Sequence, residues 1–367
     1  MTATTEPATH RDRLERLCLA LDAAGVEALW VEPSVSLSYL TGLDPVSVER
    51  LFGLIVRPDD DLRLVVPELL AEESKELPGE AELFVWDDAR GPHQATAAAL
   101  DGIDRLVIQG SLPSWSWALL RAARPGIEVD IDDELLGRLR ELKDATEVDA
   151  LRRSGAVTDE IVAWVGTLEL GGLTEAQLAG RIQARYLELG HRPSPHGLIA
   201  SGANAAMPHY VAGADPIATE ALLLMDIGCA VEGYWSDITR IYFPRPLEGE
   251  LASCYEIVCA AYDAAFAAAR PGVACKEVDA AARTVIADAG YGDHFIHRTG
   301  HGLGLEVHEP PWITGTNERP LEVGHVFSIE PGIYLPGRFG VRYENIVHLG
   351  ENGPESMNHS AREHFFG

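Results

Sequence analysis

The chain has 367 residues, 46% of them hydrophobic, and its 57 acidic and 29 basic residues give a formal net charge of −28. This length usually exceeds what one hydrophobic core serves, so we expect two ordinary globular domains. The acidic excess argues against binding to a phosphate backbone, which requires clustered Lys and Arg, so nucleic acid is not an expected partner.

Signals for membrane insertion and for disulfide formation are weak. No window approaches eighteen consecutive apolar residues, and the N-terminal stretch carries charges where a signal peptide needs an apolar run. The five cysteines form no CxxC pair, so we expect reduced thiols. The sequence therefore predicts a cytoplasmic protein without a membrane partner.

The first part of the chain alternates helical and strand patterns. Helices are predicted over 11–25, 93–100 and 114–123, and strands over 26–31, 51–56, 62–66, 106–109 and 127–131. Asp144 and Glu147 resemble a capping box that opens a long helix after a charged stretch. We therefore expect a smaller α/β domain over residues 1–138, with no recognisable catalytic constellation, and a second domain over 139–367.

The second domain repeats one order of elements. Helices over 145–170 and 174–189 precede a hairpin over 221–243, and helices over 248–270 and 275–289 precede a hairpin over 325–349. The period of about 100 residues is too long for a solenoid, so an internal two-fold duplication is expected, with a cleft between its halves. The fold class is α+β.

Each of these two hairpins carries a pair of acids within apolar strands. A turn centred between Val231 and Glu232 would place Asp226 opposite Asp237, and Glu330 and Glu344 are symmetric about Gly337. Opposed like charges destabilise a sheet, and two divalent cations bridged by carboxylates would compensate all four acids. Any one of these acids alone is equally well read as a solvated strand end, but two pairs in equivalent positions are not.

A fifth ligand is expected between the hairpins. Glycines flank His301 and permit close backbone approach to a ligand. Four carboxylates and one imidazole suit Mn, Fe, Co or Zn, and we expect two divalent ions with Mn as the first choice. The zinc-protease signature HExxH is absent, because His308-Glu309 precedes Pro310-Pro311.

The segments MDIG, SDITR, HRTGHGLGLEVHE, SIEPGIY and GVRYEN occur in that order. Together they resemble the metallopeptidases of the pita-bread fold, which include prolidase, aminopeptidase P and methionine aminopeptidase. The preceding α/β domain and YLTG at 39–42 are similar to the prolidase and aminopeptidase P branch, with its creatinase-type N-terminal domain. The resemblance also implies a homodimer that acts on small peptides.

The resemblance implies a role for each matching residue. Asp226 would bind one metal, Asp237 and Glu344 would bridge, and His301 with Glu330 would bind the other. His209 and His308 would hold the substrate carbonyl and its tetrahedral intermediate. The outer substrate-binding positions would be His297, Tyr334 and Arg342.

A mechanism follows from this set. The two cations would hold a bridging water as hydroxide, which attacks the carbonyl before proline, while Glu330 shuttles the proton and His308 stabilises the oxyanion. In a dipeptidase a cation would pair with the substrate carboxylate, and Arg50 and Arg342 are the candidates. The preferred function is cleavage of Xaa-Pro dipeptides.

Three alternatives stay open at this point. Aminopeptidase P would act on longer Xaa-Pro peptides. A hydrolase or lyase of a non-peptide metabolite could use the same fold, and a metal-free binding or regulatory protein could keep the fold as an interaction surface. The intact set of five ligands weighs against the last of these.

Overall fold

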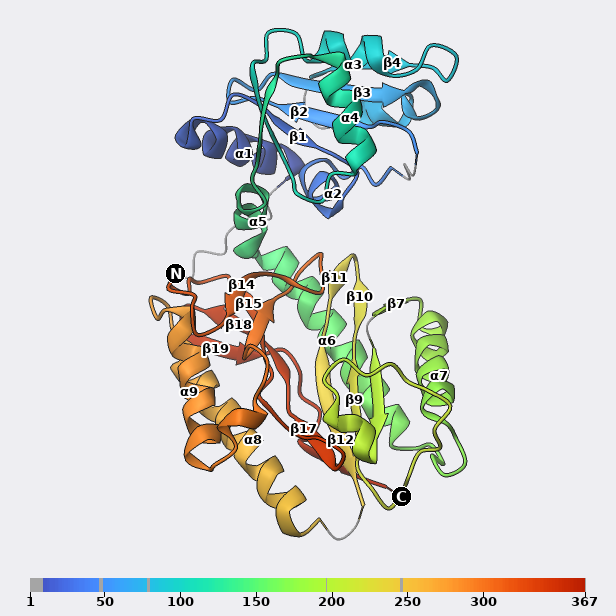
Figure 1. Ribbon diagram of the computed structural model, residues 1–367, viewed down its shortest axis with the longest axis vertical. Coiled ribbons are helices and arrows are strands. Elements are labelled where there is room, and N and C mark those ends of the chain that lie inside the picture. Colours follow the sequence, from blue (N-terminus) through green and yellow to red (C-terminus); the bar gives the residue numbers. More distant parts are fainter. Residues whose placement is uncertain (1–8, 46–48, 78–79, 196, 245–246, 367) are drawn as a thin grey trace. The chain divides into compact units, whose positions relative to one another are not determined.

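The computed structural model describes residues 9–45, 49–77, 80–195, 197–244 and 247–366. The chain divides into two compact units between Arg140 and Glu141 (Figure 1). Residues 1–8 of the domain predicted over 1–138 lie outside the described residues.

The N-terminal unit is built on a mixed sheet with the order β4-β3-β2-β1-β5-β6. Its strands are β1 Leu29–Val31, β2 Gly53–Val56, β3 Leu62–Pro67, β4 Ala81–Trp86, β5 Arg105–Ile108 and β6 Glu128–Ile131. Its helices are α1 His10–Ala24, α2 Val35–Thr41, α3 His93–Ala99, α4 Ser114–Ala123 and α5 Glu134–Glu141, with 3-10 helices η1 Glu68–Leu70 and η2 Glu73–Glu76. The predicted helices and strands of this region are therefore present.

Two α-helices and one strand among the described residues of this unit escaped sequence prediction, as did both 3-10 helices. The helices are α2 and α5, and the strand is β4. Strand β4 lies at the sheet edge, where Val85 is 46% exposed, so its pattern lacks the apolar run of a buried strand. By contrast, α1 could be predicted from the sequence. Its leucines Leu14, Leu17 and Leu21 lie at helical spacing and are fully buried, and Gly25 ends the helix at φ +65.

The C-terminal unit contains two helix pairs and several small sheets. The helices are α6 Ala145–Val165, α7 Glu175–Glu188, α8 Gly249–Ala268 and α9 Cys275–Asp288, with 3-10 helices η3 Gly202–Ala206 and η4 Gly292–His294. The strands of the first half are β7 Arg192–Pro193, β8 Leu198–Ser201, β9 Leu223–Ile227, β10 Cys229–Val231, β11 Tyr234–Trp235 and β12 Ile238–Phe243. The remaining strands are β13 Gly300–Gly302, β14 Glu309–Ile313, β15 Val326–Ile329, β16 Gly332–Leu335, β17 Phe339–Arg342, β18 Asn345–Gly350, β19 Gly353–Ser356 and β20 Glu363–Phe365.

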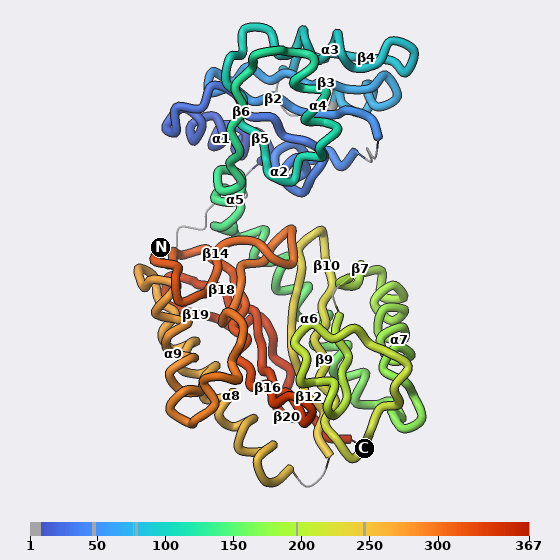
Figure 2. The backbone as a smooth tube through the Cα atoms, in the orientation of Figure 1, coloured from blue at the N-terminus to red at the C-terminus, as the bar shows by residue number. Residues whose placement is uncertain are grey.

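The expected repeat of helix pair and hairpin is visible along the chain. Figures 1 and 2 show α8 and α9 on one side of the strands and α7 on the other. One core packs α8 and α9 against strands of the second half, and another packs α6 and α7 against β9 and β12. The duplication therefore places both hairpins between the helix pairs.

Helix α6 ends earlier than predicted, and α8 is unusually apolar. The prediction that the first runs to 170 was wrong, because α6 ends at Val165: Thr167 and Leu168 donate to Trp164 and Val165 in tight turns, and Leu170 turns into the core. Helix α8 is long and apolar enough to cross a membrane by length and composition alone. Its buried face packs in the core of this unit, as expected for a helix of a folded domain.

The second carboxylate hairpin has the predicted register. Ile329 pairs with Asn345 in β15 and β18, and Gly332 pairs with Arg342 in β16 and β17. The same register places Glu330 opposite Glu344, at the break between the two strand pairs. Gly337 at φ +73 occupies the turn.

The first hairpin does not have the predicted register. Asp226 pairs with Thr239, and the same register places Gly228, not Asp226, opposite Asp237. The turn is formed by Glu232 and Gly233, both at positive φ, because buried β-branched Val231 stays in β10 instead of adopting that conformation. The shift is two residues, so both aspartates still share one face of the hairpin.

Candidate metal centre

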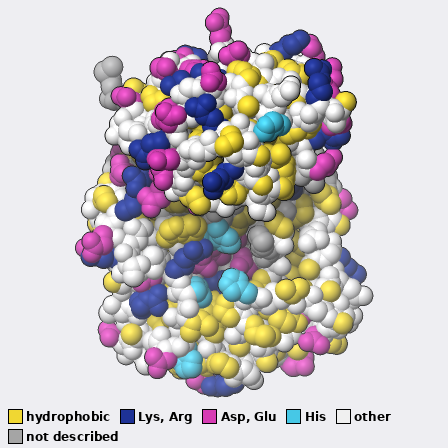
Figure 3. All heavy atoms as spheres, turned by 45° about the horizontal axis from the view of Figure 1, so that its top comes forward, with side chains coloured by type: hydrophobic (Ala, Val, Ile, Leu, Met, Phe, Trp, Pro, Cys, Tyr) yellow, Lys and Arg dark blue, Asp and Glu magenta, His cyan; other side chains and the backbone are white. Residues whose placement is uncertain are grey.

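A cleft of about 690 Å³ opens within the C-terminal unit. Figure 3 shows histidine and acidic side chains gathered in a hollow of this unit. All five predicted metal ligands line the cleft, namely Asp226, Asp237, His301, Glu330 and Glu344. The predicted substrate residues His209, His297, His308 and Arg342 line it as well.

The five predicted ligands converge into groups that could hold an ion. Asp226, Asp237 and Glu344 form one group, and His301, Glu330 and Glu344 form another; within each group the ligand atoms lie within 4.8 Å of one another. Glu344 belongs to both groups. The bridging roles that the family resemblance implied for Asp237 and Glu344 stay predictions.

Two hydroxyl groups, one from each hairpin, contact the glutamates of the second hairpin. The hydroxyl of Thr239, which stands opposite Asp226, donates to Glu344 Oε2 at 2.7 Å. The hydroxyl of Ser328 donates to Glu330 Oε1 at 3.1 Å. Each hydroxyl therefore orients one glutamate of the second hairpin.

His301 lies on β13 with a fixed ring. Its Nδ1 is 3.1 Å from the Gly302 carbonyl oxygen, and its Nε2 lies 3.3 Å from Glu330 Oε1 and 3.9 Å from Asp237 Oδ2. An Nδ1 proton donated to that carbonyl leaves Nε2 free to bind a metal. The flanking glycines serve the neighbouring strands, because an added Cβ would lie 1.9 Å from the Ser328 carbonyl oxygen at Gly300 and 2.2 Å from that of Pro310 at Gly302.

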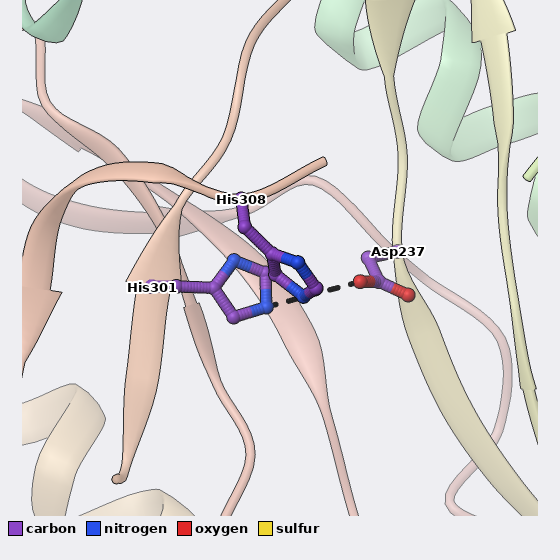
Figure 4. Close-up of side chains that lie close together, drawn as sticks. All are labelled: Asp237, His301 and His308. Carbon is purple, nitrogen blue, oxygen red and sulfur yellow. Dashed lines mark ion pairs between the residues drawn. The ribbon is translucent and has the colours of Figure 1, made fainter. Parts of the chain in front are cut away.

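His308 also reaches the acidic groups. Its ring stands edge-on to the ring of His301 at 4.3 Å between centroids, and it forms a third possible ligand group with Asp237 and His301. Figure 4 shows Asp237 facing the two imidazoles from the opposite side of the cleft. His308 is thus close enough to act on a group bound beside the acids.

The carboxylates repel one another in a buried setting. Burial, followed by the charges of Glu344 and Asp226, holds the pKa of Asp237 well above its usual value. Burial and the charge of Glu330 do the same for Glu344, and burial raises the pKa of Glu330 to about 7. Burial also lowers the pKa of His301, so its imidazole is neutral. An excess of buried negative charge beside a neutral imidazole fits a pair of divalent cations.

A chain of hydrogen bonds borders this acidic cluster. Arg342 donates to Asp226 Oδ2 at 2.6 Å and to the Tyr334 hydroxyl at 2.8 Å. The same hydroxyl lies 2.9 Å from His297 Nε2, whose other ring nitrogen is 2.7 Å from the Arg298 carbonyl oxygen. Burial and the charge of Arg342 lower the pKa of His297 to about 3, so this histidine is a neutral acceptor for Tyr334.

Two other predicted residues lie outside that chain of bonds. His209 is exposed and lines the cleft, and the next residue, Tyr210, donates its hydroxyl to buried Glu175 at 2.6 Å. Arg50 belongs to the N-terminal unit, where its guanidinium donates to Asp88 and Glu49. The predicted role of Arg50 as the partner of a substrate carboxylate stays a prediction.

The structure adds a cleft residue that sequence reasoning missed. Arg298 lines the cleft, and its guanidinium carbon lies 4.4 Å from the centroid of the Trp312 ring. Burial lowers the pKa of Arg298, against the opposing charge of Glu330. Arg298 sits between His297 and His301 in the sequence, but no spacing rule singles it out.

Comparison with known proteins identifies the family of both units. Residues 149–351 match metallopeptidase family M24, and residues 13–154 match the creatinase/prolidase N-terminal domain. The chain is 38% identical to a probable dipeptidase of Mycobacterium tuberculosis, over 95% of both chains. It is 33% identical to an Xaa-Pro dipeptidase of Pyrococcus furiosus, over 96% of this chain and 99% of that protein.

A solved structure gives the same result for the fold. The crystal structure of a prolidase from Thermococcus sibiricus superposes with a TM-score of 0.92 at 33% identity, covering 98% of this chain and all of that one. The predicted α+β pita-bread fold with a creatinase-type N-terminal domain is therefore confirmed, as is the resemblance inferred from the five motifs. The family match spans more than half of the chain, and we conclude that this protein is a metal-dependent peptidase that belongs to metallopeptidase family M24.

Proposed function

We propose that the chain is an Xaa-Pro dipeptidase that holds two divalent ions, Mn as the first choice, between Asp226, Asp237, His301, Glu330 and Glu344. The observation that carries the proposal is the meeting of these ligand atoms in two groups that share Glu344. Relatives named Xaa-Pro dipeptidase and prolidase support the substrate class. We further propose that the protein works in the cytoplasm as a homodimer.

Bound divalent ions supply Lewis acidity and lower the pKa of water at such a centre. The protein residues position the substrate and move the protons. Glu330 accepts a proton from the attacking water and returns it to the leaving proline nitrogen, for which a carboxyl whose own pKa is raised is suited. His308 and His209 donate hydrogen bonds to the carbonyl oxygen as it gains negative charge.

Arg342, Tyr334 and His297 act one step further out. The guanidinium holds Asp226 in place, and Tyr334 links that guanidinium to His297. Because all three are buried or half-buried and mutually bonded, they keep the Asp226 carboxylate in one orientation.

A dedicated enzyme is needed for this bond because the nitrogen before proline carries no hydrogen. Peptidases that require that N–H in register cannot bind such a substrate productively. A centre that acts through the carbonyl oxygen and the proline nitrogen itself avoids this requirement.

The test compares proline release from an Xaa-Pro dipeptide with cleavage of an Xaa-Pro tripeptide, with Mn, Co and Zn supplied in turn. We expect the dipeptide to be preferred and Mn to give the highest activity. Preference for the tripeptide would instead identify an aminopeptidase P. Release from neither peptide by a fully loaded protein would leave the non-peptide hydrolase or lyase, and less than one bound ion per chain would leave the metal-free alternative.

A further inference from the structure

Among the described residues, the arginines that line the cleft are Arg298 and Arg342, and Arg342 is hydrogen-bonded within the protein. Arg342 donates from Nε to Thr239, from Nη1 to Tyr334 and from Nη2 to Asp226, at 2.6–2.8 Å. It is 3% exposed. All three guanidinium nitrogens of Arg342 already donate within the protein, so Arg342 is a poor partner for a substrate carboxylate.

Arg298 is in a different situation. The structure gives it a ring contact with Trp312, but no ion pair with a carboxylate of the described residues. The residue is half-buried and lines the cleft. A partly desolvated cation without an anionic partner is costly, and a guanidinium presents two parallel N–H donors that match a carboxylate.

The Arg298 guanidinium is also preorganised. Its face is set by the Trp312 ring, and the Trp312 carbonyl accepts from Asn317 at 2.7 Å. On either side of Arg298 the backbone is held, because Arg283 donates to the His297 carbonyl at 3.0 Å and the Thr299 hydroxyl donates to Asp279 at 2.8 Å. A cation fixed in this way loses little freedom on binding a ligand.

The overall charge of the cleft points to the same kind of ligand. Its four predicted carboxylate ligands carry as much negative charge as two divalent ions carry positive charge. With both ions bound, the arginines leave the cleft net positive. An anionic substrate group is therefore favoured beside Arg298.

We propose that Arg298 binds the α-carboxylate of the C-terminal proline in an Xaa-Pro dipeptide, and thereby makes the enzyme select dipeptides. This inference rests on the proposed function. Every Xaa-Pro dipeptide carries this carboxylate one residue from the scissile carbonyl. Arg298 lines the same cleft as the predicted metal ligands, so it is within the reach of such a substrate. In a longer peptide the same position is a neutral amide, which gives Arg298 no charge to pair with.

The test uses the metal-loaded full-length protein with Arg298→Met and Arg298→Lys. The substrates are Ala-Pro, its C-terminal amide and Glu-Pro. For Arg298→Met we expect kcat/KM on Ala-Pro to fall about 30- to 100-fold, mainly through KM, and kcat/KM on the amide to stay within about threefold of wild type. Arg298→Lys should recover part of the loss, because it keeps the charge without the paired donors.

Arg192→Met is the matched control. Arg192 also lies over a tryptophan, 4.7 Å from the Trp235 centroid, and it is not among the residues that line the cleft. We expect it to change neither substrate. Metal content and thermal unfolding of each variant are measured alongside, and inhibition by proline and by prolinamide gives a second readout, in which Arg298→Met should weaken only proline.

The possible outcomes separate this inference from the function on which it rests. A wild-type protein that cleaves Ala-Pro, with Arg298→Met lowering dipeptide and amide equally, would overturn the inference alone. A fall in kcat/KM of Arg298→Met on Glu-Pro alone would also overturn it, because Arg298 would then bind the side chain of an acidic first residue. A wild-type protein that cleaves no Xaa-Pro dipeptide would remove the proposed function and this inference together.

Discussion

The two carboxylate hairpins perform similar tasks with different registers. In the second hairpin the register places Glu330 directly opposite Glu344, around a three-residue turn at Gly337. In the first, Asp226 faces Thr239, and Asp237 is displaced by two residues around a two-residue turn. The face on which a carboxylate lies is therefore common to both hairpins, while direct opposition is not.

The displacement gives the first hairpin a second function. Because Thr239 stands opposite Asp226, its hydroxyl can donate to Glu344 and accept from Arg342, at 2.7 and 2.8 Å. An aspartate in place of Thr239 would add a fifth negative charge to the four acids of the site. The difference teaches that one hairpin supplies an opposed acid pair, whereas the other supplies acids together with the hydrogen bonds that orient its neighbour.

The largest effect is expected from removing one central acid of each hairpin. Asp237→Asn and Glu344→Gln should each lower kcat at least about a thousandfold while the protein stays folded, because each acid takes part in two of the possible ligand groups. Proline release and circular dichroism check this. If one variant kept wild-type activity, that acid would not be a metal ligand, and its hairpin would not supply a central acid to the metal centre.

Metal removal should expose the repulsion among the acids as a pH-dependent loss of stability. The pKa of Glu330 is raised from 4.5 to about 7, so the folded chain binds this proton more tightly than the unfolded chain does. Its contribution is present below about pH 4.5 and is lost as pH rises through about 7, which costs the metal-free protein a few kcal/mol. The raised pKa values of Asp237 and Glu344 act in the same direction.

Thermal unfolding from pH 5 to pH 8, with chelator or with Mn, measures this effect. The melting temperature of the metal-free protein should fall over that range, whereas bound metal should oppose the fall because it favours ionised ligands. Glu330→Gln serves as the control and should flatten the metal-free profile. A metal-free melting temperature that rises with pH would contradict the account.

A smaller effect is expected for the hydroxyls that orient the two glutamates. Thr239→Val removes the bond to Glu344, and Ser328→Ala removes the bond to Glu330. Each should weaken metal affinity about 10- to 100-fold, as measured by metal titration. Thr239→Ser keeps the hydroxyl and should stay near wild type; an equal loss in that variant would show that the methyl group and not the hydrogen bond matters.

The smallest effects concern the turns. Glu232 adopts φ +52, and its ion pair with Arg153 is exposed, so Glu232→Asn should stabilise the protein by about 0.5–1 kcal/mol by forming an Asn-Gly turn. Gly337→Ala, at φ +73, should instead destabilise by about 1 kcal/mol. Denaturant unfolding measures both, and a destabilised Glu232→Asn would contradict the claim that the positive φ at this position is strained for glutamate.

Most of the fold followed from local patterns, and the register of the first hairpin did not. Helices such as α1 and α9 follow from apolar spacing and stop signals, and the symmetry of Glu330 and Glu344 about Gly337 fixed their opposition. In the first hairpin the deciding fact was that buried Val231 does not adopt positive φ. Sequence periodicity reports which face a residue lies on, but not which residue it pairs with.

The candidate site shows the same division. The five predicted ligands could be named because each is a charged residue within an apolar strand or a histidine between glycines. Arg298 and Thr239 have no such mark in the sequence, and only the fold brings them to the site. What marks Arg298 is the absence of an ion-paired carboxylate among the described residues, which only the folded structure reveals. Conversely, Arg342 was expected to be available to a substrate, but the structure shows it bound to Asp226.

The claim that both hairpins jointly form one two-ion centre is tested most directly by counting bound Mn. Equilibrium dialysis and elemental analysis of wild type, Asp237→Asn and Glu344→Gln give ions per chain. Two ions per chain in wild type, with a loss of metal in both variants, is the predicted result. Fewer than one ion per chain in wild type after full loading, or two ions retained in both variants, would contradict it.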